Sequence, residues 1–439
     1  MKKYFILLSV LGISFTLWAQ NPVVEYWGNG NKKSEGNKIN TKEDGRWTYY
    51  YSNGKKYMEG SFQNGLEVGE WIKWHRNGQK EALYYPEGGT YTGWFPNGNT
   101  ESKGFYKNQQ KDSAWVFYYE NGQVSRTCYY VNNLVEGECK EYHQKGLLSF
   151  QGFYHKGELE GYGTWWYDNG QIEMQGKSMQ GMQDSIWAFY FKDGQMGSKG
   201  GFEEGKQDGN WIFYYETGEK WREGSYKAGK REGLWVAWYE NGKKQREGNF
   251  ANDKEEGLWV QWFPSGKKQD EGYFCQGKMC KTWQGWHISG VLKYKMEYLD
   301  NKKHGSYLYY WGNGKLQFEG NYKNDQKNGK WKEYSQYGIP VQSGKYEFDR
   351  KCGQWSFYNP QGALARKQGF YDDFPHGKWI EYFPNGKKHS QGEYNMLNKT
   401  GIWTYYSEQG EITYQVQYDH NVLVKVLKQK KAVSPSGKR

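Results

Sequence analysis

The cysteines are the first residues in this sequence whose type and spacing could do chemistry. The segment TCYYVNNLVEGEC places Cys128 and Cys139 eleven positions apart. A second pair, Cys275 and Cys280, encloses the segment CQGKMC, and Cys352 stands alone. Two nearby thiols can bind a metal, exchange electrons or form a structural disulfide. The choice among these depends on the elements that position them.

The other residue types that carry chemistry form no catalytic constellation. Three of the eight histidines, His75, His143 and His287, each stand three residues before a recurring glycine, where other copies of the pattern have Tyr or Phe. We interpret them as substitutes in an aromatic row. Acidic residues also recur at one fixed position, namely at Glu59, Glu223, Glu247, Glu271 and Glu319. Paired-carboxylate catalysis needs one site with two unequal environments, and no glycine-rich loop opens a helix to hold a phosphate. The sequence therefore predicts no enzyme activity, no metal site and no cofactor.

One repeat runs through the chain and explains these recurrences. Its marker is a turn glycine, spaced by 24 residues throughout except for one interval of 20, between Gly78 and Gly98. The turn glycines are Gly30, Gly54, Gly78, Gly98, Gly122, Gly146, Gly170, Gly194, Gly218, Gly242, Gly266, Gly290, Gly314, Gly338, Gly362, Gly386 and Gly410. Most of them follow Asn, and Asn-Gly is the strongest short signal for a two-residue type I′ hairpin turn. We expect each repeat to be a strand, an Asn-Gly turn, a second strand and a longer polar loop.

Three further positions recur with the turn glycine. The tryptophan position, seven residues before it, holds Trp in twelve of the sixteen repeats from Gly54 onward. The glycine position, six residues after it, is mostly Gly, and the ring position, eight residues after it, holds Phe or Tyr in fourteen of the sixteen. A two-residue turn would pair Trp235 with Gly248 and Phe250 with Gly233. We expect each ring to cover the glycine that faces it across its own hairpin.

These recurrences predict the fold class. It is all-β, with tandem 24-residue β-hairpin repeats forming an elongated single-layer antiparallel meander. A closed propeller is the alternative, but a propeller blade needs four strands and one repeat supplies two. Stability should then be a sum of terms within repeats and between neighbours, with no single globular core.

The repeat Glu223–Gly242, EGSYKAGKREGLWVAWYENG, carries a family resemblance. Its Glu-Gly-x-Tyr, Lys-x-Gly-Lys and Gly-x-Trp-x-x-Tyr elements resemble the MORN repeat, especially the bacterial variant found in YwqK-type antitoxin-like proteins. The similarity covers essentially residues 24–418 and departs from the commonest MORN pattern in having Trp where a second glycine is usual. The resemblance implies hairpins in one elongated sheet. For function it implies scaffolding, protein contacts, membrane association or toxin neutralisation.

The same pairing rule, continued across the longer loop, pairs the cysteines. Cys128 lies at a glycine position and Cys139 at the tryptophan position that faces it. The rule also places Cys275 opposite Cys280 and leaves Cys352 unpaired. We therefore predict two cross-strand disulfides. A metal site is disfavoured because such a pair supplies only two ligands and no nearby histidine completes it.

The tryptophans of four successive repeats should fall on one face of the sheet at regular spacing. They are Trp211, Trp235, Trp259 and Trp283. In one interpretation they pack on glycines and neighbouring strands. In the other they are candidate ligand-facing aromatics, a row of exposed rings for a sugar chain or an extended partner.

The ends of the sequence indicate export. Residues 1–19 resemble a signal peptide, with Lys2 and Lys3 before the apolar run Tyr4–Trp18, which is shorter than the ~20 residues of a membrane span. We divide the chain into this signal peptide, an N-terminal partial or capping repeat (20–45), a MORN-like repeat array (46–418) and a basic C-terminal tail (419–439). We expect the mature chain to be periplasmic, outer-envelope-associated or secreted, where disulfides persist.

Composition and charge narrow the choice of partner. Aromatic residues are 19% of the chain and all hydrophobic residues 36%, so any core must be built largely from rings. Of the net charge of +11, two charges lie in Lys2 and Lys3 and six in the acid-free end His420–Arg439, which leaves +3 for residues 20–419. A nearly neutral body predicts no nucleic-acid binding. The tail could contact anionic lipid or polysaccharide, and a solvated end is the alternative.

Three functional classes follow from these observations. The first is an exported non-catalytic repeat scaffold that mediates protein–protein interaction at the cell envelope, with a protein partner. The second is an immunity or antitoxin-like protein that neutralises a toxin. The third is a glycan- or lipid-binding module.

Overall fold

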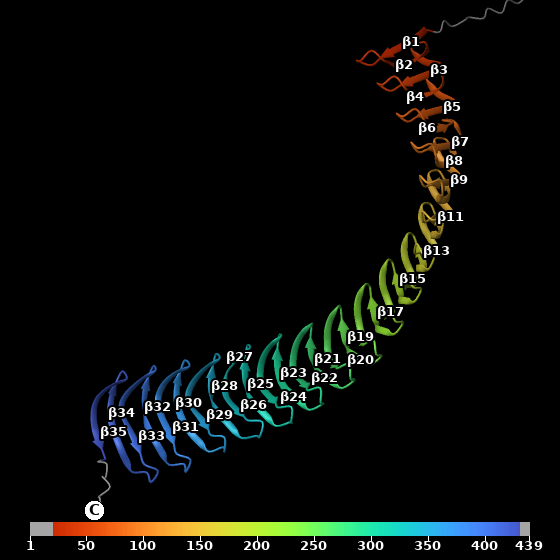
Figure 1. The fold of residues 1–439 in the computed structure, drawn as a ribbon. Helices are drawn as coiled ribbons and strands as arrows, with labels where there is room; N and C mark the ends of the chain where they lie inside the picture. Colours follow the sequence, from red (N-terminus) through yellow and green to blue (C-terminus); the bar gives the residue numbers. More distant parts are fainter. Residues whose placement is uncertain (1–20, 431–439) are drawn as a thin grey trace, which may run out of the picture. The chain divides into compact units, whose positions relative to one another are not determined.

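The computed structural model describes residues 21–430. These residues form 36 β-strands and no helix (Figure 1), so the described part of the chain contains no helix that could span a membrane. The predicted signal peptide, at 1–19, lies outside the described residues, as do residues 431–439. The chain divides into two compact units, one ending at Lys206 and one beginning at Gln207, which we describe separately.

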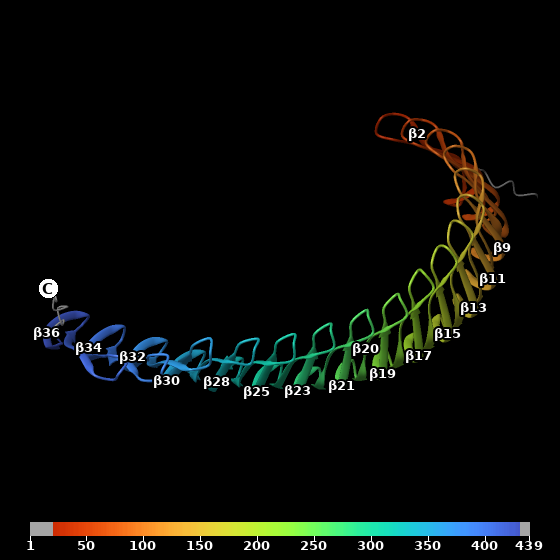
Figure 2. The same cartoon turned by 60° about the horizontal axis from the view of Figure 1, so that its bottom comes forward.

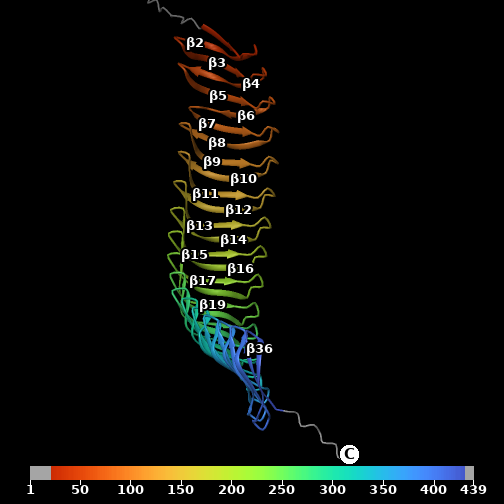
Figure 3. The ribbon, with the colours of Figure 1, turned by 90° about the vertical axis from the view of Figure 1, so that its left-hand side faces the viewer.

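The first unit is an antiparallel meander in which each strand pairs with the next one in the sequence. Figure 3 shows its strands from β3 to β15 as successive rungs. The strands are β1 Asn21–Tyr26, β2 Lys32–Ile39, β3 Lys42–Tyr50, β4 Lys56–Gln63, β5 Leu66–Trp74, β6 Lys80–Tyr84, β7 Gly88–Trp94, β8 Thr100–Lys107, β9 Gln110–Tyr118, β10 Val124–Val131, β11 Leu134–Tyr142, β12 Leu148–His155, β13 Glu158–Trp166, β14 Ile172–Met179, β15 Met182–Tyr190 and β16 Met196–Glu203.

The second unit is a meander of the same kind, with β26 pairing with both β27 and β28. Figure 2 shows β19 to β25 as one layer. The strands are β17 Lys206–Tyr214, β18 Lys220–Lys227, β19 Lys230–Trp238, β20 Lys244–Ala251, β21 Lys254–Trp262, β22 Lys268–Cys275, β23 Lys278–Trp286, β24 Leu292–Leu299, β25 Lys302–Tyr310, β26 Leu316–Lys323, β27 Gln326–Lys327, β28 Gly329–Tyr334, β29 Pro340–Glu347, β30 Arg350–Tyr358, β31 Leu364–Tyr371, β32 Phe374–Tyr382, β33 Lys388–Asn395, β34 Asn398–Tyr406, β35 Ile412–Asp419 and β36 Val422–Gln429.

Each unit is an open sheet built from hairpins. Among the described residues, β1 pairs with β2 alone and β36 with β35 alone, so no pairing closes either meander. The predicted all-β meander of hairpin repeats is confirmed, and the closed propeller is excluded. The segment predicted as a basic tail is strand in part, because Val422–Gln429 forms β36 against β35.

The two turns of each repeat differ from the sequence prediction. The turn at the Asn-Gly pair is the longer one, and the connection expected to be a longer loop is the short one. At Gly54 the turn has three residues: the Gly54 N–H donates to the Tyr51 carbonyl at 2.9 Å, and positive φ occurs only at Gly54 (82°). This is a type I turn closed by a glycine bulge. The type I′ turn lies at the other end of the strands, where Asn64 and Gly65 have φ of 54° and 81°. The predicted type I′ turn at Asn-Gly is therefore wrong, and the expected longer loop is the two-residue turn.

The predicted hairpin register is nevertheless confirmed along the body of the strands. Trp235 pairs with Gly248, and Gly233 pairs with Phe250. The third turn residue shifts the pairing by one position, and a bulge at Ala237 and Trp238 shifts it back. A rule derived from the wrong turn therefore gives the right pairs.

A second bulge lies on the other side of each tryptophan-bearing strand. Between the pairs Glu223↔Val236 and Ser225↔Glu232, β19 has two more residues than β18. Gly233 lies in this bulge with φ of 67°, a conformation that glycine adopts without a steric penalty. The bulge changes the direction of the tryptophan that follows it, and this decides where the ring lies.

Candidate functional site

Each tryptophan ring lies on the strand before its own. A Cβ added to Gly248 would overlap the indole of Trp259, and a Cβ on Gly224 would overlap that of Trp235. The Trp235 indole N–H donates to the Ser225 carbonyl, 3.1 Å away on the same preceding strand. The expectation that each ring covers the glycine across its own hairpin is therefore wrong. The bulge before the tryptophan turns the side chain toward the other neighbour.

The sequence itself follows this arrangement. Where a glycine position is not glycine, the next tryptophan position usually changes with it: Cys128 is followed by Cys139, Met296 by Tyr307 and Val416 by Leu427. One repeat keeps the tryptophan without the glycine. There Gln368 is buried at the glycine position, and Trp379, which pairs with it, is only half-buried. Because any side chain at the glycine position takes the place of the indole, the two positions act as one pair.

The rings of the ring position, buried at Phe250 and half-buried at Tyr226 and Phe274, complete a continuous aromatic row in the second unit. The Tyr226 and Trp235 centroids are 5.1 Å apart, and the Phe250 centroid is 6.1 Å from Trp235 and 5.0 Å from Trp259, all edge-to-face. Edge-to-face pairs at these distances stabilise a core beyond the area they bury. The row continues through Phe274 to Trp283.

The four tryptophans proposed as ligand-facing are buried. Trp211, Trp235, Trp259 and Trp283 expose 2%, 5%, 4% and 9% of their surface. They do not form a row of exposed rings. The indoles of Trp235, Trp259 and Trp283 lie against glycines of the preceding strand, and all four tryptophans are flanked by neighbouring rings. The alternative interpretation, in which they pack on glycines and neighbouring strands, describes the structure.

The structure joins both cysteine pairs as disulfides. Cys128 and Cys139 pair directly across β10 and β11, with Cα atoms 4.2 Å apart. Cys275 and Cys280 are also bonded, with Cα atoms 5.9 Å apart, but they lie diagonally across the turn from β22 to β23 and are not opposite each other as predicted. The second bulge of this repeat shifts the register beyond the glycine position. Cys352 is the free cysteine among the described residues, and burial raises the pKa of its thiol.

The histidines and repeated acids have structural partners. His75, His143 and His287 place Nε2 at 2.7, 2.8 and 3.1 Å from a backbone carbonyl of the next repeat. The Tyr215 hydroxyl donates to the equivalent carbonyl at 2.8 Å, which confirms that the histidines substitute for tyrosines. Of the repeated acids, Glu247 forms an ion pair with a lysine of its own strand at 2.6 Å. The described residues contain no cluster of three His, Cys, Asp or Glu side chains that could hold a metal.

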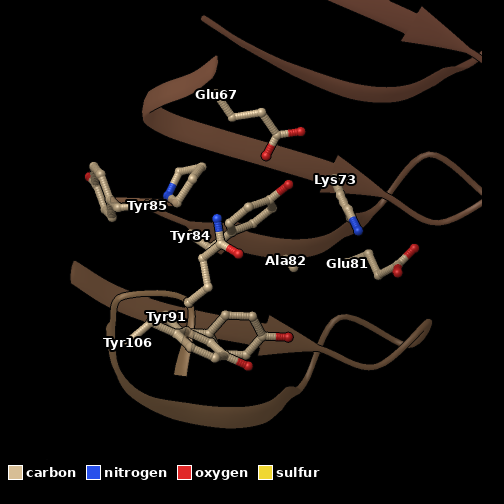
Figure 4. A pocket seen from close by; sticks show the side chains of 10 residues that line it. Glu67, Lys73, Glu81, Ala82, Tyr84, Tyr85, Tyr91 and Tyr106 are labelled. Atoms are coloured by element: carbon tan, nitrogen blue, oxygen red, sulfur yellow. The ribbon is translucent and has the colours of Figure 1, made fainter. Parts of the chain in front are cut away.

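One departure from the regular repeat is a cavity in the first unit. It has a volume of about 460 Å³ and lies where the interval between turn glycines falls to 20 residues. Figure 4 shows the Glu67 carboxylate pointing toward the ring of Tyr84, with Lys73 beside Glu81 at one end. The lining residues are Glu67, Lys73, Glu81, Ala82, Tyr84, Tyr85, Pro86, Tyr91, Tyr106 and Gln109.

The ionisable groups of the cavity are shifted by burial. Burial raises the pKa of the Glu67 carboxyl, and the nearby Lys73 ammonium opposes this shift. Burial also raises the pKa of Tyr91 to about 12, and the pKa values of Tyr84 and Tyr106 rise for the same reason. All three phenols are therefore protonated at neutral pH and can donate hydrogen bonds.

Comparison with known families identifies the repeats. Nine segments match the profile of the MORN repeat variant: 43–64, 87–108, 111–132, 159–177, 207–228, 231–252, 303–324, 375–396 and 399–420. The chain carries MORN-variant repeats. No curated protein sequence matches the chain.

Similarity to solved structures is weak. The crystal structures of TcdB2-TccC3-TEV and TcdB2-TccC3-Cdc42 match at 10% and 11% identity, each with a TM-score of 0.15. The matches cover 93% and 91% of this chain but only 23% and 26% of those chains, so this chain spans about a quarter of their length. They carry no argument about the function of the MORN-variant repeats.

A row of exposed rings does exist in the MORN-variant repeats, on the face opposite the tryptophans. Phe105, Tyr129 and Phe153 stand seven residues after three successive turn glycines and expose 38%, 46% and 52% of their surface. Neighbouring residues in a strand point to opposite faces, so Tyr129 points away from the face on which Tyr130 is buried against Trp115. Reasoning from the sequence missed this row. The signal was the run of aromatic residues at a position where most other repeats have a polar residue or glycine.

Proposed function

We propose that the chain is an exported, non-catalytic repeat scaffold that binds a protein partner at the cell envelope. The observation that carries the proposal is the exposed row Phe105, Tyr129 and Phe153. Successive members are two strand spacings apart, roughly 9.5 Å. The same position holds Ser61 and Asn249 in regular repeats, so the fold itself does not need a ring there.

The neighbourhood of the row favours a protein over a sugar chain. The exposed side chains Tyr162 and Ile186 extend the apolar surface toward later strands of the same unit. Beside Phe153, the Glu138 carboxylate accepts hydrogen bonds from Lys140 at 2.8 Å and Gln151 at 2.6 Å. Aromatic anchors with polar groups at their edge are typical of protein interfaces.

The test removes the row and leaves the fold intact. The variant F105S/Y129S/F153S is compared with the native chain and with the control L234S/L258S/I402S. The control removes three exposed apolar residues from a different repeat position. Each tagged chain is expressed in its own host, cross-linked and recovered from cell fractions, and circular dichroism checks folding. We expect one protein to co-purify with the native chain and the control from the envelope fraction, and to be lost from the row variant.

Several outcomes would overturn the proposal. Equal recovery of the same partner with the row variant would show that the exposed row does not bind the partner. Recovery of the chain from the cytoplasm would contradict the proposal that it is exported. A toxin as the specific partner would favour the YwqK-type antitoxin alternative, whereas retention on glycan or anionic liposomes without any protein would favour a glycan- or lipid-binding module.

A further inference from the structure

The cavity in the first unit arises because one hairpin is shortened. β6 has five residues and β7 has seven, whereas the corresponding strands of the regular repeat that follows, β8 and β9, have eight and nine. The ring position holds Pro86, so no ring covers the tryptophan face there. Tyr84 occupies the glycine position and Tyr91 the tryptophan position of this pair. The space left above the short hairpin is lined by Glu67 and Lys73 from β5 and by Gln109 from the turn after β8.

The walls of this space offer rings together with hydrogen-bond donors and acceptors. Tyr84, Tyr91 and Tyr106 contribute ring faces and protonated hydroxyls. Glu67 is an acceptor whose carboxylate makes no hydrogen bond or ion pair with the described residues. The Lys73 ammonium is a donor, and Gln109, in the turn after β8, is both.

The charges disfavour two classes of ligand. An anion would meet the carboxylates of Glu67 and Glu81. An organic cation would meet Lys73, whose ammonium already lies 5.6 Å from the centre of the Tyr84 ring. A neutral ligand with several hydroxyl groups and an apolar ring face uses both the acceptors and the donor, and the volume of about 460 Å³ is in the range of small-ligand pockets.

We propose that this cavity is a binding site for a neutral saccharide. A sugar ring stacks on the tyrosine faces, its hydroxyls donate to the Glu67 and Glu81 carboxylates, and other hydroxyl oxygens accept from Lys73 and Gln109. The site is separate from the exposed row of the proposed function and does not depend on it.

The experiment titrates the full chain with glucose, galactose and N-acetylglucosamine, and with choline and phosphate as cation and anion probes, followed by calorimetry and ligand-observed NMR. Two variants test the site. Glu67→Gln removes a charged acceptor. Gln109→Gly removes the amide side chain, and the turn should tolerate glycine because Gly65 occupies the equivalent turn position. The matched control is Glu43→Gln, because Glu43 stands eleven residues before its turn glycine, as Glu67 does.

We expect at least one of the three sugars to bind at millimolar concentration. Its affinity should fall about tenfold in Glu67→Gln, because a hydrogen bond to a charged group is lost, and by a smaller factor in Gln109→Gly. The control should bind as the native chain does. The proposal is overturned if no sugar binds, if choline or phosphate binds in place of sugar, or if the control loses as much affinity as the two variants.

Discussion

The regular repeat at Gly242 and the shortened repeat between Gly78 and Gly98 show what the 24-residue length accomplishes. In the regular repeat, Trp235 lies on Gly224 and is flanked by Tyr226 and Phe250, so the face is filled. In the shortened repeat the ring position holds Pro86 in place of a ring, and a cavity lies there. Both repeats keep their backbone pairing, because backbone hydrogen bonds do not depend on the ring.

This difference separates the two tasks of the repeat. Hairpin pairing makes the sheet, whereas the pair of glycine and tryptophan positions fills its face. Stability in such an array is a sum of local and neighbour terms, so one repeat can give up its packing and the rest remain folded. A repeat that has lost packing is then free to take a ligand.

The largest expected effect comes from filling a glycine position in a regular repeat. Gly248→Val should expel the Trp259 indole, since a Cβ there overlaps the ring, and should cost about 3 kcal/mol locally. Hydrogen exchange of β20 to β22 and tryptophan fluorescence measure the loss. Asn249→Val, on the opposite face, is the control and should change neither. Unchanged protection in Gly248→Val would mean that the glycine–tryptophan pair does not hold the sheet together.

A smaller effect is expected where the disulfide replaces that pair. Peptide mapping without reductant should recover Cys128 joined to Cys139, and reduction should cost about 2 kcal/mol around β10 and β11. The double variant C128G/C139W restores a regular pair and should be protected in hydrogen exchange whether or not reductant is present. The single variant Cys139→Trp should be destabilised, because the side chain of Cys128 occupies the place of the indole. If the double variant is no better protected than the single one, the disulfide does not stand in for a glycine–tryptophan pair.

The smallest effect tests the shortened repeat through pH. Burial raises the folded pKa of Glu67 above its ordinary value of 4.5, so its ionised carboxylate disfavours folding at neutral pH. The penalty is present above the folded pKa and disappears below the unfolded pKa, where the carboxyl is protonated in both states. Glu67→Gln should therefore melt at a slightly higher temperature than the native chain at pH 7, and the two should converge below about pH 4. Glu43→Gln should show no such gain, and an equal gain there would indicate a general effect of charge.

Much of the fold could be predicted because the recurring turn glycine fixes which residues pair across each hairpin. The recurrence of the turn glycine gave two strands per repeat, and the pairing of Trp235 with Gly248 followed from it. The turn type could not be read in the same way. Asn-Gly favours a type I′ turn, but in this protein Asn53 accepts the Lys55 N–H at 3.1 Å within a three-residue turn, and φ is positive only at the glycine. The true type I′ turns mostly have Gly, Asn or Asp as their second residue, as at Gly65 and Asp253. Their first residue varies, and Met396-Leu397 has neither, so this signal is weaker than the Asn-Gly pairs.

The candidate sites were predicted less well than the fold. The sequence placed Cys128 opposite Cys139 correctly, because both lie before the register changes, and it misplaced Cys275 and Cys280, which lie beyond the second bulge. It left open whether the tryptophans pack on glycines or form an exposed row, whereas they are buried and the exposed rings are Phe105 and its equivalents. Periodicity shows which residues share a face, but not which face is covered.

The sequence by itself determined the repeat, the strand count per repeat and the pairing along each hairpin, because these depend on local spacing. The tertiary structure decided the direction of each tryptophan, the identity of the exposed face and the existence of the cavity. These depend on bulges and on the strand before, which lie outside any single hairpin. A side chain turns toward whichever neighbour leaves room, and that room becomes visible only when adjacent repeats are placed side by side.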